Sequence, residues 1–165
     1  MNTQFQDKNK IAKLRKEQHD LGRQKMQSEK YFESLEIFTN AFSKFGSHVL
    51  LLCDIVACYM ILGRTHEGLA ATATLQTELN IASKNLSNST LCRCHVFIGK
   101  LLEEQAQLTD AMTSYQKGLS YADQDQPLKN LAEAQILRLS AFCDQNNIFE
   151  KLYLTCTRSN PESKN

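Results

Sequence analysis

The sequence predicts an all-α fold made of stacked antiparallel helix pairs. Apolar residues recur at helical spacing, as in Leu108, Ala111, Tyr115 and Leu119, and such a stripe along one helix must be buried against a neighbour. Small and aromatic positions also return after 34 residues and again after a further 43, which is 34 plus a nine-residue insertion. A period near 34 is typical of arrays of helix pairs. The corresponding positions are Ser34, Gly68 and Ala111, followed by Phe38, Thr72 and Tyr115.

Turn-forming residues divide the chain into eight predicted helices. Gly46 and Gly63 are expected to end helices, and Ser47 is expected to cap the helix after Gly46. Asn88 or Ser89 is the expected cap of the fifth helix. The predicted helices span 8–27, 29–44, 48–62, 66–83, 90–106, 108–122, 128–144 and 147–157, with breaks at Asp123 to Pro127 and at Asn146 and Asn147. They form one helical-repeat domain over 1–157, and 158–165 is expected to be a disordered tail.

Composition restricts the range of functions. The chain has 165 residues and a formal charge of +1, which gives no overall attraction to nucleic acid or to an anionic membrane. The first thirty residues carry a local excess of four positive charges, which we interpret as a solvated helix face. Six cysteines without a secretory signal, and no apolar run long enough to span a membrane, predict a cytoplasmic protein with reduced thiols.

The segment from Leu21 and Gly22 through 29–42 resembles a tetratricopeptide repeat. The turn of the second unit, Leu62-Gly63-Arg64, is similar to the turn between the helices of that family. Gly22 and Gly99 match the small position in the first helix of a repeat, and Val56 departs from it. The resemblance implies a right-handed superhelix of antiparallel helix pairs, an α-solenoid with about three repeats and a degenerate terminal hairpin near 128–157.

The same resemblance implies a binding groove on the concave face, lined by the first helix of each pair. An apolar centre between two basic margins would suit a protein or peptide partner with apolar and acidic groups. The family's clamp for a terminal carboxylate is not intact, because His19 and Arg23 replace its first pair and Asp54 stands where Asn would be useful. The groove residues carried over are His19, Arg23, Leu50, Cys53, Ala57, Met60, Ile61, Arg93, Val96 and Lys100.

No catalytic motif stands out in the sequence. It lacks a phosphate-binding loop, a His-Glu-x-x-His pair and a nucleophile elbow. Cys92, Cys94 and His95 form the most conspicuous cluster, but structural zinc usually needs two further ligands at a suitable spacing. We therefore predict no enzyme activity, no cofactor and no metal, and expect these cysteines to be buried as small apolar residues.

The leading hypothesis is a non-enzymatic protein-binding module, either an adaptor or a chaperone-like protein. The alternative is a regulatory or sensor domain of a larger transcription or signalling protein. Nucleic-acid binding is a weaker option, because the basic residues of 8–25 spread around several helix faces. The stripe of Phe38, Phe42 and Phe45 also leaves room for a homodimer.

Overall fold

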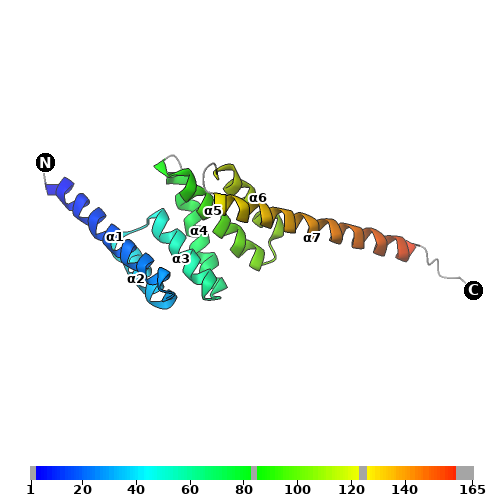
Figure 1. Ribbon diagram of the computed structural model, residues 1–165, viewed down its shortest axis with the longest axis horizontal. Helices are drawn as coiled ribbons and strands as arrows, with labels where there is room; N and C mark the ends of the chain where they lie inside the picture. The colour runs from blue at the N-terminus through cyan, green and yellow to red at the C-terminus, as the bar shows by residue number, and fades with distance from the viewer. Residues whose placement is uncertain (1–2, 83–84, 123–125, 159–165) are drawn as a thin grey trace, which may run out of the picture.

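The computed structural model describes residues 3–82, 85–122 and 126–158, with the side chains of 8–82, 85–122 and 126–145. These residues form seven helices and no strand, which confirms the predicted all-α class. The helices follow one another along the long axis of the molecule (Figure 1). Among the described residues, no helix has the length and apolarity needed to cross a membrane. The helices are α1 (Thr3–Gln27), α2 (Tyr31–Phe45), α3 (Val49–Ile61), α4 (Thr65–Ala82), α5 (Asn88–Glu104), α6 (Leu108–Ser120) and α7 (Gln126–Arg158).

The turns inside the first three helix pairs have the same backbone geometry. Glu29, Gly63 and Ala106 each adopt a positive φ, of 59°, 67° and 57° respectively. These positions are separated by 34 and 43 residues, as the sequence pattern predicts. In each turn the next N–H donates to the carbonyl five residues earlier, at 3.0 Å for Lys30, 2.9 Å for Arg64 and 2.9 Å for Gln107. This is the bond that closes a Schellman motif, so α1–α2, α3–α4 and α5–α6 are equivalent hairpins.

Two of the three hairpins are closed by an aromatic ring lying against a glycine. A side chain at Gly22 would collide with the ring of Phe38, and one at Gly99 would lie 2.8 Å from Cε1 of Tyr115. Both rings are fully buried. In the middle hairpin the two corresponding positions hold Val56 and Thr72, so the larger side chain stands on the first helix and the smaller one on the second.

Two consecutive hydrogen bonds join the first three helices. The Ser34 hydroxyl donates to the Gly22 carbonyl at 2.9 Å, and the Cys58 thiol donates to the Ser34 oxygen at 3.7 Å. Burial raises the pKa of Cys58 to about 11, although the contact with Ser34 opposes this shift. Cys58 is therefore a protonated thiol at neutral pH and acts as a donor in the packing between hairpins.

The core consists of three apolar clusters, each shared by consecutive hairpins or by the last hairpin and α7. Helix α3 takes part in two of them, and nine of its thirteen residues are buried. It packs against α2, α4 and α5, so side chains on most of its circumference are removed from water. Phe38 is buried within one of these clusters, with Phe42 and Phe45 packed beside it.

Several predicted boundaries are wrong. Helix α3 is capped at His48 without a side-chain hydrogen bond, not by Ser47. The cap of α5 is Ser87, whose hydroxyl accepts from the Thr90 N–H at 3.3 Å, not Asn88 or Ser89. The largest difference is at the C-terminal end, where the expected hairpin with a break at Asn146 and Asn147 is replaced by the single helix α7. Of the predicted tail, Arg158 is helical and 159–165 lie outside the described residues.

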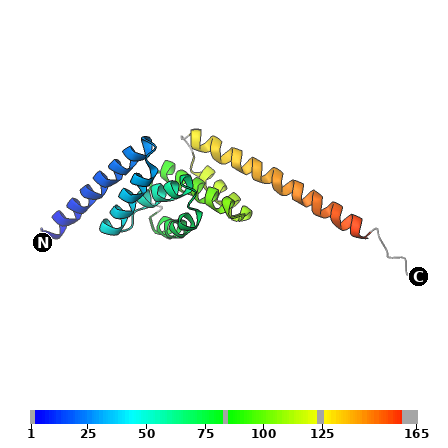
Figure 2. The same ribbon diagram turned by 90° about the horizontal axis from the view of Figure 1, so that it is seen from below.

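Helix α7 packs against α5 and α6 near its start and then projects away from the body (Figure 2). Ala132 and Leu139 are residues of α7 that are buried in the cluster shared with α5 and α6. Arg138 forms an ion pair with Glu103 of α5, and the same carboxylate accepts a hydrogen bond from the Tyr115 hydroxyl at 3.1 Å. Beyond this contact, Phe142 is about half exposed.

Candidate functional site

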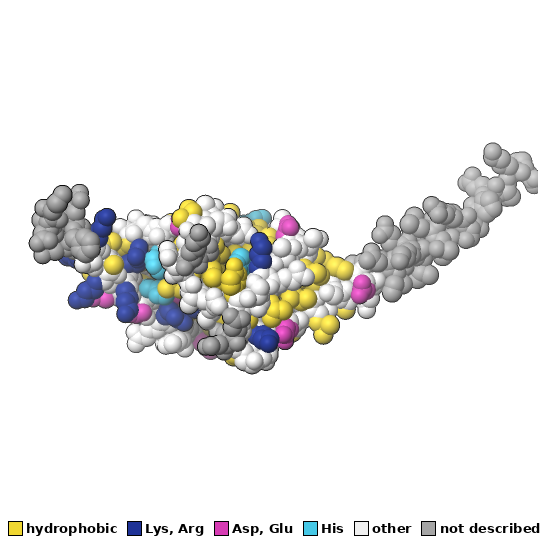
Figure 3. Space-filling model, turned by 90° about the horizontal axis from the view of Figure 1, so that it is seen from above, with side chains coloured by type: hydrophobic (Ala, Val, Ile, Leu, Met, Phe, Trp, Pro, Cys, Tyr) yellow, Lys and Arg dark blue, Asp and Glu magenta, His cyan; other side chains and the backbone are white. Residues whose placement is uncertain are grey.

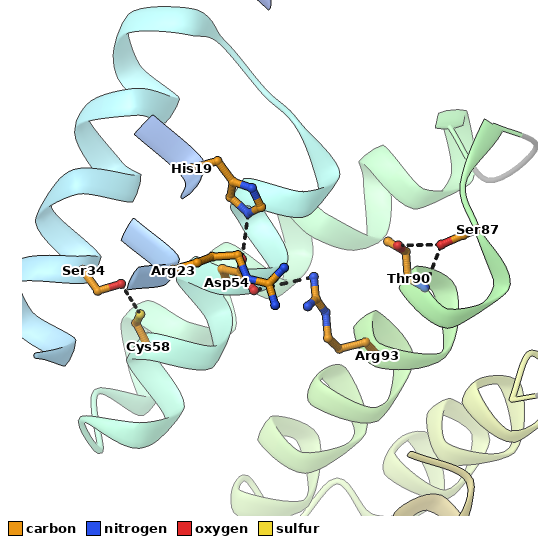
Figure 4. A network of polar contacts seen from close by, with 8 residues as sticks. All are labelled: His19, Arg23, Ser34, Asp54, Cys58, Ser87, Thr90 and Arg93. Atoms are coloured by element: carbon orange, nitrogen blue, oxygen red, sulfur yellow. Dashed lines mark hydrogen bonds and ion pairs between the residues drawn. The ribbon is translucent and has the colours of Figure 1, made fainter. Parts of the chain in front are cut away.

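A buried carboxylate on α3 links helices from three different hairpins (Figure 4). The Asp54 side chain is only 5% exposed, and its Oδ2 lies 2.7 Å from Nε2 of His19 on α1. Arg23, also on α1, places its Nε 3.9 Å from the same oxygen. Arg93 on α5 places its Nη2 3.6 Å from Oδ1. Asp54 therefore brings three basic side chains together at the centre of the array.

A cavity of about 290 Å³ lies over this cluster, and we call it the groove cavity. Its wall combines charged and apolar side chains from α1, α2, α3 and α5, so it spans the three hairpins. Ile61 at its rim is 47% exposed. The lining residues are Arg23, Met26, Gln27, Tyr31, Asp54, Ala57, Ile61, Arg93 and Phe97.

The two arginines of the groove cavity retain donor capacity. Their contacts with Asp54, at 3.6 and 3.9 Å, are longer than a hydrogen bond. Each guanidinium carries five N–H donors, and the side chains of Arg23 and Arg93 are 50% and 20% exposed. Nε of Arg93 is buried. Asp54 thus orients both groups by charge, while their exposed N–H groups remain suited to carbonyl or carboxylate oxygens of a ligand.

The structure brings together part of the predicted groove set. Arg23, Ala57, Ile61 and Arg93 line the groove cavity. His19 and Leu50 line a neighbouring cavity of about 390 Å³ between α1 and α3, which Arg23 also borders. This second space is called the α1–α3 cavity below.

The remaining predicted residues lie elsewhere. Cys53 and Val96 are buried in separate apolar clusters, and Met60 packs against the cluster that contains Cys53. Lys100 pairs with Glu103 at 3.7 Å, one helical turn away on the same helix. Neither Cys53 nor Val96 lines the groove cavity.

Asp54, Tyr31 and Phe97 line the groove cavity but are not among the groove residues that the resemblance implies. The resemblance implies an apolar centre between basic margins, whereas the structure places a carboxylate there. Asp54 stands within the apolar run from Val49 to Ile61, and a charged residue in such a run is buried only when it has partners. A lone carboxylate in an apolar run therefore indicates a buried charge with partners. The sequence does not identify those partners, because they lie 31 to 39 positions away in other hairpins.

The side chains of Cys92, Cys94 and His95 point in different directions from α5, so they do not form one site. Cys92 faces the cluster shared with α6 and α7, and Cys94 faces the cluster shared with α3 and α4. His95 stacks on Tyr121, with ring centroids 5.9 Å apart and an interplanar angle of 9°. Within the part of the chain that the structure describes, no three His, Cys, Asp or Glu side chains are grouped as metal ligands would be.

Two comparisons with known proteins identify no relative of this chain. A scan against protein-family models finds no match, and a search of the curated proteins finds no similar sequence. The geometry of the groove cavity is therefore the basis for the functional argument.

Proposed function

We propose that this protein is a non-enzymatic interaction module of the tetratricopeptide-like kind, which binds a peptide or helical segment of a partner protein across the groove cavity. The observation that carries the proposal is the position of Arg23 and Arg93. They come from the first and third hairpins and flank a buried carboxylate of the second. A ligand that engages both guanidinium groups would span all three hairpins.

The chemistry of the cavity favours a polypeptide ligand over a small polar molecule. Exposed apolar surface at Ile61 adjoins partly buried Tyr31, Met26 and Phe97, and such surfaces usually mark interfaces. Arginine donors beside apolar side chains can hold a backbone carbonyl or an acidic side chain while neighbouring apolar groups of the ligand are buried. Aromatic residues and arginine are also enriched where protein interfaces bind most strongly.

The experiment uses one substitution at two exposed isoleucines. Ile61 lies in the groove cavity, whereas Ile81 is 75% exposed at the end of α4 and lines no cavity described above. Wild-type protein, Ile61→Gln and Ile81→Gln are used to capture partners from the native lysate. A photoreactive benzoylphenylalanine at Gln27, an exposed residue of the cavity wall, then marks the segment that is bound.

The proposal predicts a partner that is captured by wild type and by Ile81→Gln, is lost with Ile61→Gln, and is crosslinked at position 27. We expect the loss to be at least tenfold, about 1.4 kcal/mol of binding free energy. Equal capture by all three proteins, without a crosslink, would place the interface on another face.

A further inference from the structure

The α1–α3 cavity has a marked excess of positive charge. Its wall contains Arg15, Lys16 and Arg23 but one carboxylate, that of Asp20. The nearby Asp54 faces His19 and Arg23 of this wall and also Arg93 outside it, so its single negative charge is shared among three basic side chains. Without counting the histidines, the wall thus holds two more positive charges than negative ones. On the face in Figure 3, basic side chains and histidines gather at the α1 end of the molecule.

The composition of the cavity wall suits an anion held against the protein surface. Leu50 and Leu51 form part of its wall beside the charged side chains, and Leu51 is fully buried. Apolar neighbours lower the local polarisability and strengthen the interaction between the basic groups and an anion. A carboxylate would offset one of the two excess charges, whereas a phosphate group carries about −1.5 to −2 at pH 7.

We propose that the α1–α3 cavity binds the phosphate group of a phosphorylated side chain on the partner protein. Arg23 borders both this cavity and the groove cavity, so a phosphorylated residue of a groove-bound peptide can reach Arg15 and Lys16. Naming a phosphorylated partner rests on the proposed function. The affinity of the cavity for phosphate does not, and it can be measured separately.

His48 reports on the charge in this cavity. Burial lowers its pKa, and Arg15 and His19 lower it further, whereas Glu78 of α4 has the opposite effect. Lys16, Asp20 and Arg23 are the other charged groups of the wall. A bound dianion would stabilise the protonated imidazole, so phosphate binding should raise the pKa of His48.

The test is a titration of the full chain followed by NMR, with N-acetyl-phosphoserine N-methylamide as the probe. The matching N-acetyl-aspartate N-methylamide supplies a single carboxylate. Arg15→Gln/Lys16→Gln removes two charges from the cavity, and Lys10→Gln/Lys13→Gln removes two from exposed positions of the same helix outside it. Vesicles containing phosphatidic acid test a lipid phosphate as the alternative source.

We expect the phosphoserine probe to shift the signals of Arg15, Lys16 and His48 and to raise the pKa of His48. Its affinity should exceed that of the aspartate probe at least fivefold, fall at least tenfold in Arg15→Gln/Lys16→Gln, and change less than twofold in the control pair. Equal binding of both probes, or equal loss in both variants, overturns the proposal, since either result indicates general charge attraction. Binding to the vesicles without binding to phosphoserine also overturns it, in favour of a membrane phosphate.

The two proposals can fail independently. Ile61→Gln should leave the affinity for the phosphoserine probe unchanged, because Ile61 does not line the α1–α3 cavity. Phosphoserine binding without a groove partner would contradict the proposed function, and with it the phosphorylated partner, but not the affinity of the cavity for phosphate. A groove partner that binds equally well with and without phosphate would contradict only the inference drawn from the cavity.

Discussion

Gly22 of α1 lies directly against the ring of Phe38 on α2, so that a Cβ at position 22 would be 2.7 Å from Cδ1 and 2.8 Å from Cζ of the ring. The ring is fully buried. The first hairpin therefore depends on the absence of a side chain at this position.

Gly22→Ala should destabilise the protein through overpacking, by about 1–3 kcal/mol. Phe38→Leu, which reduces the ring to a smaller side chain, should also destabilise the protein when made alone, because it leaves a void. The double variant should be more stable than the sum of the two single effects predicts. Urea unfolding of the four proteins measures this coupling, and strict additivity would show that residues 22 and 38 do not constrain each other.

The left-handed turn residues give a prediction of opposite sign. Ala106 adopts the backbone geometry that Gly63 adopts in the preceding hairpin. The left-handed region destabilises the folded state by about 1–2 kcal/mol for a non-glycine residue. Glycine avoids this cost, but its greater conformational entropy in the unfolded chain offsets about 0.5–1 kcal/mol of the gain. Ala106→Gly should therefore raise the free energy of unfolding by roughly 0.5–1 kcal/mol.

Two comparisons control for the general effect of glycine. Gly63→Ala should destabilise the protein by a similar amount, and Ala73→Gly, at an exposed position inside α4, should destabilise it by about 0.5–1 kcal/mol. Thermal unfolding at one protein concentration compares all three. A lower midpoint for Ala106→Gly would mean that the turn is not strained.

These turns also show how far the sequence could predict the fold. Gly63 signals a turn by its residue type, whereas Glu29 and Ala106 do not, and only the shifts of 34 and 43 residues identify them. The continuity of α7 was not predictable in this way. Asn146 and Asn147 resemble a turn, but each costs less than about 0.7 kcal/mol inside a helix compared with alanine, which is too little to end a helix by itself.

The site was less predictable than the fold. The resemblance to tetratricopeptide repeats implied that Arg23, Ala57, Ile61 and Arg93 lie in one groove, and the structure brings them to one cavity. The pairing of Asp54 with His19 could not be predicted, because it depends on how far α1 is rotated toward α3. That rotation is set by packing between helices, such as the contacts of Ser34 with Gly22 of α1 and Cys58 of α3, and not by the pattern within one helix.

Helix α7 should be held by apolar packing more than by its ion pair. Leu139 is buried in the cluster shared with α5 and α6, so Leu139→Ala should cost about 2–5 kcal/mol. The Arg138 side chain is 53% exposed, and its pair with Glu103 should contribute about 1 kcal/mol or less. Chemical denaturation of Leu139→Ala and Arg138→Ala ranks the two contributions, and a larger loss for Arg138→Ala would reverse the interpretation of this contact.

Stability should depend on pH through His95. Burial lowers the pKa of His95, and the positive charge of Lys117 lowers it further. The unfolded chain therefore takes up a proton at a higher pH than the folded chain does. The contribution of neutral His95 to stability is present above the unfolded pKa, near 6.5, and is lost as the pH falls below it.

His95→Gln isolates this contribution from other titrating groups. The difference in unfolding free energy between wild type and His95→Gln should be constant between pH 7.5 and 8.5, and should move in favour of the variant as the pH falls from 6.5 to 5. Urea unfolding at each pH measures the difference. A difference that does not change with pH would show that burial of His95 does not oppose its protonation.

Asp54→Asn tests whether the buried carboxylate organises the groove. The substitution keeps the size of the side chain but removes the charge that faces Arg23 and Arg93, and removing one partner of a buried charged hydrogen bond costs about 1–3 kcal/mol. The variant should therefore unfold at a lower temperature. Since the two guanidinium groups would no longer be attracted to one point, the variant should also lose the groove partner, even at temperatures where it remains folded.

Glu67→Gln is the matched control. It removes an exposed carboxylate that pairs with Arg64 at the start of α4, and it should leave partner capture unchanged. Full partner binding by folded Asp54→Asn would mean that Arg23 and Arg93 are positioned by packing alone.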